Sequence, residues 1–455
     1  MINFCLNNDK FYIIQSNKAG DRMESENVLT LLEHLIKIDS RNPFSLEKKK
    51  GKYYLGGNET EINQFLSEKL IQAGFKVEKQ FVHEDTSGKK YYNIIAEKGR
   101  GKKSIMFYGH SDTVSSTPWI SEKDALTPRS GEVTFQGKKR KAIFGLGSND
   151  MKTGLAVMCL AFKDIDPEGY RIKVAFGADE EFYSLGANVL AQSSFMDNVV
   201  AIVVPEIGDG PNKFYGHETI GIGRLGRCEF EIEVFGTGGH GAISNDKTFI
   251  NAAVEASKFA VEFEKLRKKH KDIFTFDTKN CIEGSFFISK IDCGNESLSI
   301  PSSGRIVIDC TFTPCMSIQG LQKILQDFID SLFERKVLNS VPVEGTNRKF
   351  KLKLKERPTP YSEAYLTPAD HGFTQFIKKS VNRIGKFKNY NMGYSVADEN
   401  VFKRYNPDVP VIVSGPVGWN SHRADEWVEI ESVIKLYELY KVIGEDFGHY
   451  IKKER

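Results

Sequence analysis

A histidine and an aspartate stand two residues apart at the end of a short apolar run. The stretch 104–114 reads SIMFYGHSDTV, and its residues 105–108 are typical of a strand buried on both faces. His110 and Asp112 come directly after that strand. Open α/β sheets place their sites at the carboxyl ends of strands, so this pair indicates a site. Taken alone, His-x-Asp is more often a hydrogen-bonded structural pair, and the chemical interpretation depends on the other strand ends.

Two further strand ends carry acids. The predicted strand 171–176 runs into three successive acids, the last two being Glu180 and Glu181. These acids repel one another and have no evident structural use; the alternative is a solvated acidic turn. The predicted strand 198–204 is followed by a proline and then Glu206. Because several strand–helix units deliver acids or histidine at the same end, the pattern predicts a doubly wound α/β fold with helices on both faces of the sheet.

Three more candidates lie in loops. Asp150 follows two closely spaced glycines in IFGLGSNDMKTG, His422 lies in SGPVGWNSHRADEWVEI, and His240 lies in GTGGHG. The Gly-x-Gly before Asp150 lacks the further glycine and the Lys-Ser/Thr pair of a phosphate loop, so a phosphate site is not expected there. The other histidines are interpreted as surface or packing residues.

The elements that must position these residues follow from hydrophobic periodicity. Helices are expected at 24–37, 60–73, 155–162, 185–191 and 430–447, and further strands at 76–81, 91–96 and 409–413. The segment 115–140 is expected to be a polar loop. The lysine-rich run 138–141 is interpreted as solvated.

From about Gly221 the pattern changes to half-buried strands and longer helices. The expected order is a strand at 229–235, a helix at 249–269, strands at 285–291 and 305–311, a helix at 318–333 and a strand at 349–355. This βαββαβ order is the ferredoxin-like unit. The α/β pattern resumes afterwards, which predicts a catalytic domain in two parts (1–220 and 358–455) with an inserted domain at 221–357.

Composition limits the classes of partner. The chain has 455 residues, long enough for two domains, and a net charge of +3, which argues against nucleic acid. Neither a bilayer-spanning run nor a secretory signal is expected, so no membrane partner is predicted. The 7 cysteines are scattered without a C-x-x-C pair, which favours a reduced, cytoplasmic location.

Five motifs, in order and spacing, resemble one family. HSDTV, GxxDMKxG, ADEE, the strand-end Glu206 and the late SGP…SH are similar to the M20 family of dinuclear zinc metallopeptidases and deacylases. That group includes acetylornithine deacetylase, succinyl-diaminopimelate desuccinylase and glutamate carboxypeptidase. The resemblance extends from about Glu24 to the C-terminus.

The resemblance implies a role for each candidate. Asp150 would bridge two divalent ions, with His110 and Glu206 completing one site and Glu181 and His422 the other. The expected metal is zinc, with cobalt or manganese as alternatives. Asp112 would orient His110, and Glu180 would be the general base that acts on a metal-bridging water. His240 would reach the oxyanion from an inserted lid and dimerisation domain, in a homodimer.

The chain departs from the family pattern at three places. Leu146 stands where an arginine is usual, Leu298 replaces the asparagine of Asn-x-Ile-Pro, and Thr311 replaces the arginine of Asp-x-Arg. The metal motifs are intact, so the expected activity is hydrolysis of an amide bond in a small N-acyl amino acid or related substrate. The alternatives are a dipeptidase or carboxypeptidase of the same family, or a catalytically silent binding homologue.

Overall fold

The computed structural model describes residues 27–42, 47–49, 52–54, 59–85, 88–207, 216–245, 248–269, 275–276, 282–294 and 298–453. They divide into two compact units. The second unit comprises Arg224–Leu366 with Tyr394–Val396, and the first comprises the described residues on either side of these segments. The domain boundaries expected at 220 and 357 stay predictions. The part of the first helix before Asn27 lies outside the described residues.

The first unit is built on a mixed β-sheet. Its strands are β3 (Lys76–Glu84), β4 (Lys90–Gly99), β5 (Ser104–His110), β8 (Arg171–Gly177), β9 (Val199–Val204), β10 (Thr219–Arg224), β22 (Asn389–Gly393) and β23 (Val411–Val413). The order is β10-β23-β9-β5-β8-β4-β3, and β22 also pairs with β10. Strands β23, β9, β5 and β8 run parallel, whereas β10, β4 and β3 join antiparallel. The predicted doubly wound mixed sheet is confirmed.

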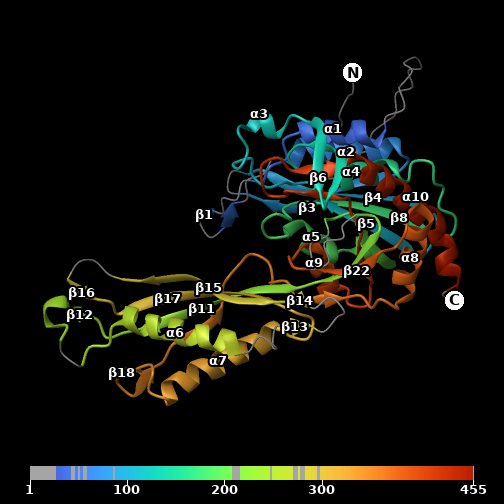
Figure 1. Cartoon of the computed structure of the whole chain (residues 1–455). Coiled ribbons are helices and arrows are strands. Elements are labelled where there is room, and N and C mark those ends of the chain that lie inside the picture. The colour runs from blue at the N-terminus through green and yellow to red at the C-terminus, as the bar shows by residue number, and fades with distance from the viewer. Residues whose placement is uncertain are drawn as a thin grey trace. The chain divides into compact units, whose positions relative to one another are not determined.

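Helices cover both faces of this sheet (Figure 1). One layer holds α1 (Val28–Lys37), α2 (Glu59–Gln72), α4 (Lys152–Leu160), α8 (Gly372–Ile384) and α10 (Ile430–Lys453), and the other holds α5 (Leu185–Ala191) and α9 (Asp398–Tyr405). Every residue of β5 is buried, as expected for a strand covered on both faces. In α1 the apolar residues at helical spacing face the core, and Asn27 caps its first turn. Among the described residues, no helix combines the length and apolar character needed to cross a bilayer.

The expected polar loop at 115–140 is wrong in part. It contains α3 (Glu122–Ala125) and a hairpin of β6 (Arg129–Phe135) and β7 (Lys138–Phe144), which join β25 (Trp427–Glu429) and β24 (Gly418–Trp419) in a second sheet. The turn Gln136-Gly137 has both φ angles positive, which suits a two-residue hairpin. Half of the residues in its two strands are exposed, and β7 begins with the basic run 138–141, which is why the sequence suggested a solvated loop here.

The second unit is a four-stranded antiparallel sheet with two helices. Its elements are β11 (Gly226–Phe235), α6 (Ala252–Lys269), β15 (Ser285–Cys293), β17 (Ser303–Phe312), α7 (Ile318–Glu334) and β20 (Lys351–Leu354). The sheet order is β15-β17-β11-β20. This is the order of a ferredoxin-like unit. Alternate residues of β11, such as Phe230 and Ile232, pack with the two helices in one apolar core.

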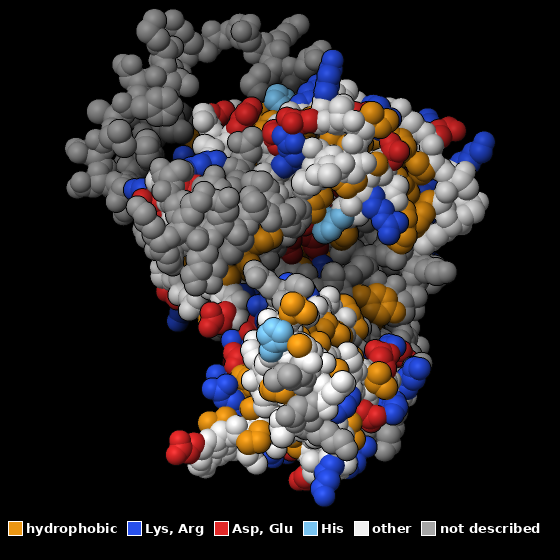
Figure 2. Space-filling model, turned by 90° about the vertical axis from the view of Figure 1, so that its left-hand side faces the viewer, with side chains coloured by type: hydrophobic (Ala, Val, Ile, Leu, Met, Phe, Trp, Pro, Cys, Tyr) orange, Lys and Arg blue, Asp and Glu red, His pale blue; other side chains and the backbone are white. Residues whose placement is uncertain are grey.

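The opposite face of that sheet is charged. Glu229 on β11 pairs with Lys355 at 2.8 Å, and Glu231 pairs with Lys353 at 3.0 Å. Arg305 on β17 adds a bond to Glu231 at 3.0 Å. The acids of these pairs are largely covered while their basic partners are more exposed, and together they keep this sheet face polar. On the side of the molecule drawn in Figure 2, acidic and basic side chains are likewise interspersed over the described surface.

Short elements complete the described chain. In the first unit these are β1 (Glu47–Lys49), β2 (Lys52–Tyr54) and η1 (Ser194–Met196). In the second they are β12 (Gly239–His240), η2 (Gly241–Ile243), β13 (Thr275–Phe276), β14 (Ile282–Glu283), β16 (Ser299–Ile300), β18 (Val341–Val343), β19 (Thr346–Arg348) and β21 (Tyr365–Leu366).

Candidate metal centre

Three parallel strands of the first unit end at the same edge of its sheet. His110 is the last residue of β5 and lies opposite Gly177, the last residue of β8. The turn after β8 carries Glu180 and Glu181, and Glu206 follows the end of β9. Parallel register therefore places one histidine and three acids together, as the strand-end pattern predicted.

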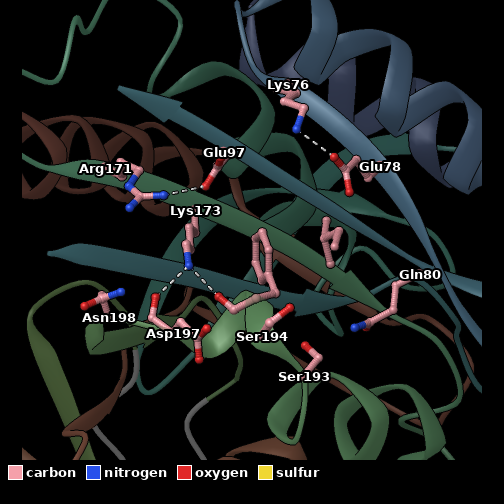
Figure 3. Close-up of a pocket in the computed structure, with 12 residues that line it drawn as sticks. Lys76, Glu78, Gln80, Glu97, Arg171, Lys173, Ser193, Ser194, Asp197 and Asn198 are labelled. Carbon is pink, nitrogen blue, oxygen red and sulfur yellow. Dashed lines mark hydrogen bonds and ion pairs between the residues drawn. The ribbon is translucent and has the colours of Figure 1, made fainter. Parts of the chain in front are cut away.

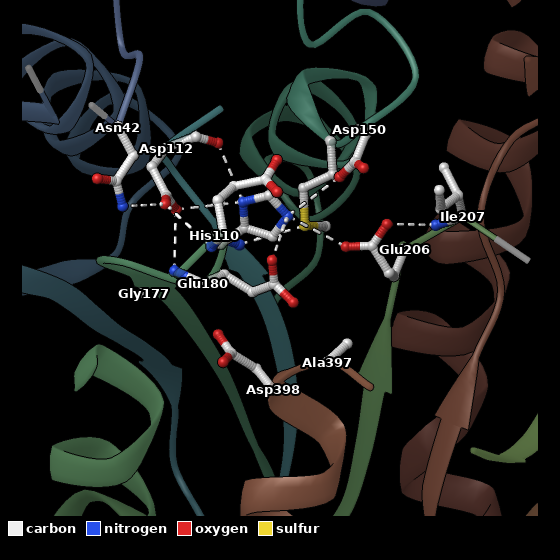
Figure 4. A network of polar contacts seen from close by, with 12 residues as sticks. Asn42, His110, Asp112, Asp150, Gly177, Glu180, Glu206, Ile207, Ala397 and Asp398 are labelled. Carbon is white, nitrogen blue, oxygen red and sulfur yellow. Dashed lines mark hydrogen bonds and ion pairs between the residues drawn. The ribbon is translucent and has the colours of Figure 1, made fainter. Parts of the chain in front are cut away.

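The first group of side chains surrounds His110, which is almost completely buried (Figure 4). Its Nε2 atom lies 3.2 Å from Glu206 Oε2 and 3.3 Å from Asp150 Oδ1. Both carboxylates are buried as well. One imidazole nitrogen and two carboxylate oxygens thus converge on one point, and these atoms all lie within 4.8 Å of one another.

The second group shares Asp150 with the first. His422 Nε2 lies 3.2 Å from Asp150 Oδ2 and 3.1 Å from Glu181 Oε2. The two oxygens of Asp150 therefore face different histidines, which is the arrangement of a bridging carboxylate. Glu181 Oε1 is buried and has no hydrogen-bond partner among the described residues. A buried oxygen without a partner is costly unless a ligand satisfies it.

This donor set fits two divalent ions. Imidazole nitrogen and carboxylate oxygen are ligands that zinc accepts, and two-metal sites share a carboxylate between ions about 3.5–4 Å apart. The crowded carboxylates also call for positive charge, because burial followed by the charge of Asp150 raises the pKa of Glu181 to about 7. The structure brings the five predicted ligands together, and the role of each stays a prediction.

Glu180 lies beside the first group. Its Oε2 atom is 3.9 Å from His110 Nε2, and Figure 4 draws its carboxylate between His110 and Asp398. Burial raises the pKa of Glu180 well above its usual value, against the opposing charge of His110. Both Glu180 and Glu181 reach the histidine, so distance alone does not assign one as base and the other as ligand.

Asp112 fixes both the histidine and the acidic turn. Its Oδ1 lies 3.3 Å from His110 Nδ1, and its backbone oxygen lies 3.0 Å from the same atom. The carboxylate also accepts the backbone N–H groups of Glu180 and Glu181, each at 3.2 Å. One buried carboxylate therefore orients an imidazole and sets the position of the two acids, a broader part than the sequence suggested.

Several residues of this network escaped sequence reasoning. Asn42 donates to Asp112 at 3.0 Å and to Asp179 at 2.9 Å. Tyr108 donates to Asp398, whose buried carboxyl lies at the start of α9. Neither Asn42 nor Asp398 had a local signal that marked it, because their partners are distant in sequence.

The structure shows the surroundings of His240 and of the three positions that depart from the family pattern. His240 is exposed in the second unit, where its Nδ1 accepts the Ala242 N–H, and its oxyanion role stays a prediction. Leu146 is buried in a small apolar cluster. Leu298 has a φ of 63°, which asparagine adopts more readily. Opposite Thr311, Arg227 supplies a guanidinium that bonds Asp309 at 2.6 Å.

A cleft of about 380 Å³ elsewhere in the first unit contains none of the predicted site residues (Figure 3). It lies over β3, β4 and β8, and its cations already have partners. Lys173 donates to the carbonyls of Phe195 and Asp197, and Arg171 pairs with Glu97 at 3.2 Å. The cleft therefore offers little unsatisfied charge to a ligand.

The protein thus combines a mixed α/β sheet with two histidine–carboxylate groups that share Asp150, a donor set suited to divalent ions. The comparisons then place it: the model of peptidase family M20/M25/M40 matches residues 106–445, and the chain belongs to that family. It is a metal-dependent amide hydrolase, a deacylase or a peptidase.

Two relatives carry the names of deacylases. The chain is 23% identical over 431 residues to a succinyl-diaminopimelate desuccinylase of Pelagibacter ubique, covering 93% of this chain and 100% of the relative. It is 26% identical over 382 residues to an acetylornithine deacetylase of Photorhabdus laumondii, covering 83% and 87%.

Two solved structures share the fold. A tripeptidase from Staphylococcus aureus matches with a TM-score of 0.64 and 15% identity, covering 93% of this chain and 98% of that one. A dinuclear metal-binding peptidase of the M20 family from Bacillus subtilis matches with a TM-score of 0.60 and 12% identity, with the same coverage. At these identities the likeness concerns the fold.

The charge of the centre predicts how stability depends on pH. Burial, then the charge of Asp150, raises the pKa of Glu426 to about 8, and the bonds to Asp150 and Glu181 raise that of His422 to about 11. Between about pH 5 and 8 the folded metal-free protein thus binds more protons than the unfolded chain, and the free energy of unfolding falls as pH rises.

Metal should reverse this trend, because the ligands bind metal only when deprotonated. We expect the Tm measured in chelator to fall from about pH 5 to 8, and the increase in Tm on adding zinc to grow over the same range. Differential scanning calorimetry at matched ionic strength measures both quantities. A chelated protein whose Tm rises with pH between about 5 and 8 would contradict the raised pKa values of Glu426 and His422.

Proposed function

We propose that this hydrolase removes the acyl group from a small N-acyl amino acid, using two divalent ions. The observation that carries the proposal is the pair of histidine–carboxylate groups that share Asp150, with Glu180 beside them. The relatives named as deacylases support the substrate class. A glutamate at position 206 resembles the deacylases and carboxypeptidases of the family more than its aminopeptidases and dipeptidases, so it supports a deacylase without separating it from a carboxypeptidase.

Each residue has a defined task in this proposal. His110 and Glu206 would hold one ion, Glu181 and His422 would hold the other, and Asp150 would contribute to both. When bound, the ions would polarise the amide carbonyl and activate water. Zinc suits these nitrogen and oxygen donors, and cobalt or manganese are the alternatives.

Glu180 moves the proton. Its carboxylate accepts a proton from the attacking water and returns it to the leaving amine, which cannot depart as an anion. Asp112 keeps the His110 ring and the acidic turn in place during the cycle. His240 donates to the oxyanion of the tetrahedral intermediate.

One substrate panel tests the proposal. Metal-loaded protein is assayed with N-acetyl amino acids, N-succinyl amino acids and dipeptides, each with zinc, cobalt and manganese. We expect the highest kcat/KM for an N-acyl amino acid. Turnover of dipeptides alone would replace the deacylase proposal with a dipeptidase or carboxypeptidase. A folded, metal-loaded protein without turnover would indicate a silent binding homologue.

We further propose a cytoplasmic homodimer that forms through the second unit. Strand β15 is an edge strand there, and Phe287 and Ile291 on it are 43% and 47% exposed. Pairing with a second copy would cover the unpaired backbone groups of this edge and the side chains of Phe287 and Ile291. Two-fold dimers are also the commonest closed assembly. The five cysteines for which the structure describes a state are free thiols, which suits a reducing compartment.

Light scattering at micromolar concentration tests the dimer. We expect about twice the mass of one chain, and replacement of both Phe287 and Ile291 by lysine should shift the mass to that of a monomer. A native protein that is monomeric under these conditions would overturn the assembly, and His240 would then act within its own chain.

A further inference from the structure

A fully buried carboxylate that no metal group includes lies behind the candidate centre. Glu426 is 1% exposed and directly precedes β25, four residues after His422. Its carboxylate faces the loop that carries Asp150. Oε2 accepts the Gly147 N–H at 2.9 Å, and Oε1 accepts the N–H groups of Asn149 and Asp150 at 2.8 and 2.9 Å.

These bonds add to the few that the loop makes within itself, such as the one from the Ser148 N–H to the Gly145 carbonyl at 3.0 Å. Gly145 and Gly147 both have positive φ, and Asn149 and Asp150 are buried, so water does not reach their N–H groups. The backbone oxygen of Glu426 accepts a fourth N–H, that of Gly145, at 3.1 Å. One residue therefore satisfies four N–H groups within six residues of loop. Several backbone N–H groups that point at one anion form a stable nest.

The same residue joins the loops of two proposed ligands. Trp427 pairs with Phe144 in the second sheet, so Glu426 and Gly145 are the next residues beyond that pair. A further bond runs from Asn149 Nδ2 to Ser421 Oγ, at 2.9 Å, beside His422. The Asp150 loop and the His422 loop are thus fastened to each other at two points.

We propose that Glu426 is a positioning residue, which holds the backbone of the Asp150 loop against the His422 loop and so sets the second metal group before any ion binds. This inference rests on the proposed metal-dependent function. Glu426 acts through the backbone of Asp150 and contacts neither the ions nor the substrate. Its loss would change the direction in which the shared carboxylate points.

Glu426→Gln tests the proposal with little change in volume. The amide nitrogen cannot accept an N–H, so at least one of the three side-chain bonds is lost together with the charge. We expect the affinity of the second ion to fall by roughly 10–100-fold, the range for residues that support ligands. The absorption spectrum of the cobalt-loaded protein should also shift, because the spectrum reports ligand geometry. Glu426→Asp, which keeps the charge, should recover part of the affinity.

Glu429→Gln is the matched control. Glu429 lies three residues further on in β25, and its carboxylate bonds Arg140 at 2.6 Å, away from the Asp150 loop. This variant should bind metal and absorb as the unchanged protein does. A folded Glu426→Gln protein with unchanged metal affinity and an unchanged cobalt spectrum would overturn the proposal.

Glu426→Asp decides the matter if Glu426→Gln does not fold. It keeps the charge but shortens the side chain that reaches the Asp150 loop, and we expect a severalfold loss of affinity for the second ion, whereas unchanged affinity would overturn the proposal. Metal affinity also separates this inference from the proposed function. Weaker metal binding in Glu426→Gln supports the positioning role even if no amide is hydrolysed, whereas turnover without this weakening supports only the function.

Discussion

Replacing Glu180 with glutamine should leave two ions bound per chain while kcat falls by roughly 10²–10⁴-fold. The amide matches the carboxylate in shape but cannot accept a proton from the attacking water or return one to the leaving amine. Because the proposed ligands remain, KM should change little. Metal counts by mass spectrometry, taken with steady-state kinetics on the best substrate of the panel, measure both effects.

Glu181→Gln is the control for this experiment, since it changes the neighbouring acid in the same way. Glu181 Oε2 lies 3.1 Å from His422 Nε2, so its replacement should weaken one metal site. Excess metal should then restore part of the activity, which it cannot do for Glu180→Gln. If Glu180→Gln loses an ion and Glu181→Gln keeps both, the two roles are reversed.

Asp150→Ala should abolish binding of both ions, because one oxygen of Asp150 faces each histidine. The affinity of each site should fall by more than the roughly 10–100-fold expected when a supporting residue is lost. Activity at stoichiometric metal should then be undetectable. Isothermal titration with zinc measures the number of sites and their affinities.

An exposed aspartate gives the control for that substitution. Asp327→Ala removes an acid that pairs with Lys323 on the surface of α7, in the second unit. It should keep both ions and full activity, as expected for an exposed pair of this kind. Retention of one tight site in Asp150→Ala would show that Asp150 belongs to a single ion and does not bridge.

The parts of the site predicted from the sequence are those with a local pattern. Strand β5 was predicted from its apolar run, and the side chains after it lie where parallel strands end. The acidic turn after β8 was visible for the same reason. Alternating or continuous apolar residues report burial directly, and His110 and the acids at 180, 181 and 206 follow the ends of such runs, whereas Asp150 and His422 lie in loops.

The remainder depends on contacts between distant segments. Glu426 contacts the Asp150 loop because β25 pairs with β7. Strand β7 itself was not predicted, because its first residues are charged and largely exposed. Asn42 reaches Asp112 across 70 residues of chain. Such partners have no spacing rule in the sequence, because the fold alone brings them together.

The central claim is that hydrolysis of an amide depends on two ions held by the five clustered residues. The most direct measurement titrates chelated protein with zinc and records bound metal and turnover of an N-acyl amino acid in the same samples. We expect no turnover without metal, saturation at two ions per chain, and activity that returns as the sites fill. Full activity in exhaustively chelated protein, with no metal detectable, would contradict the central claim.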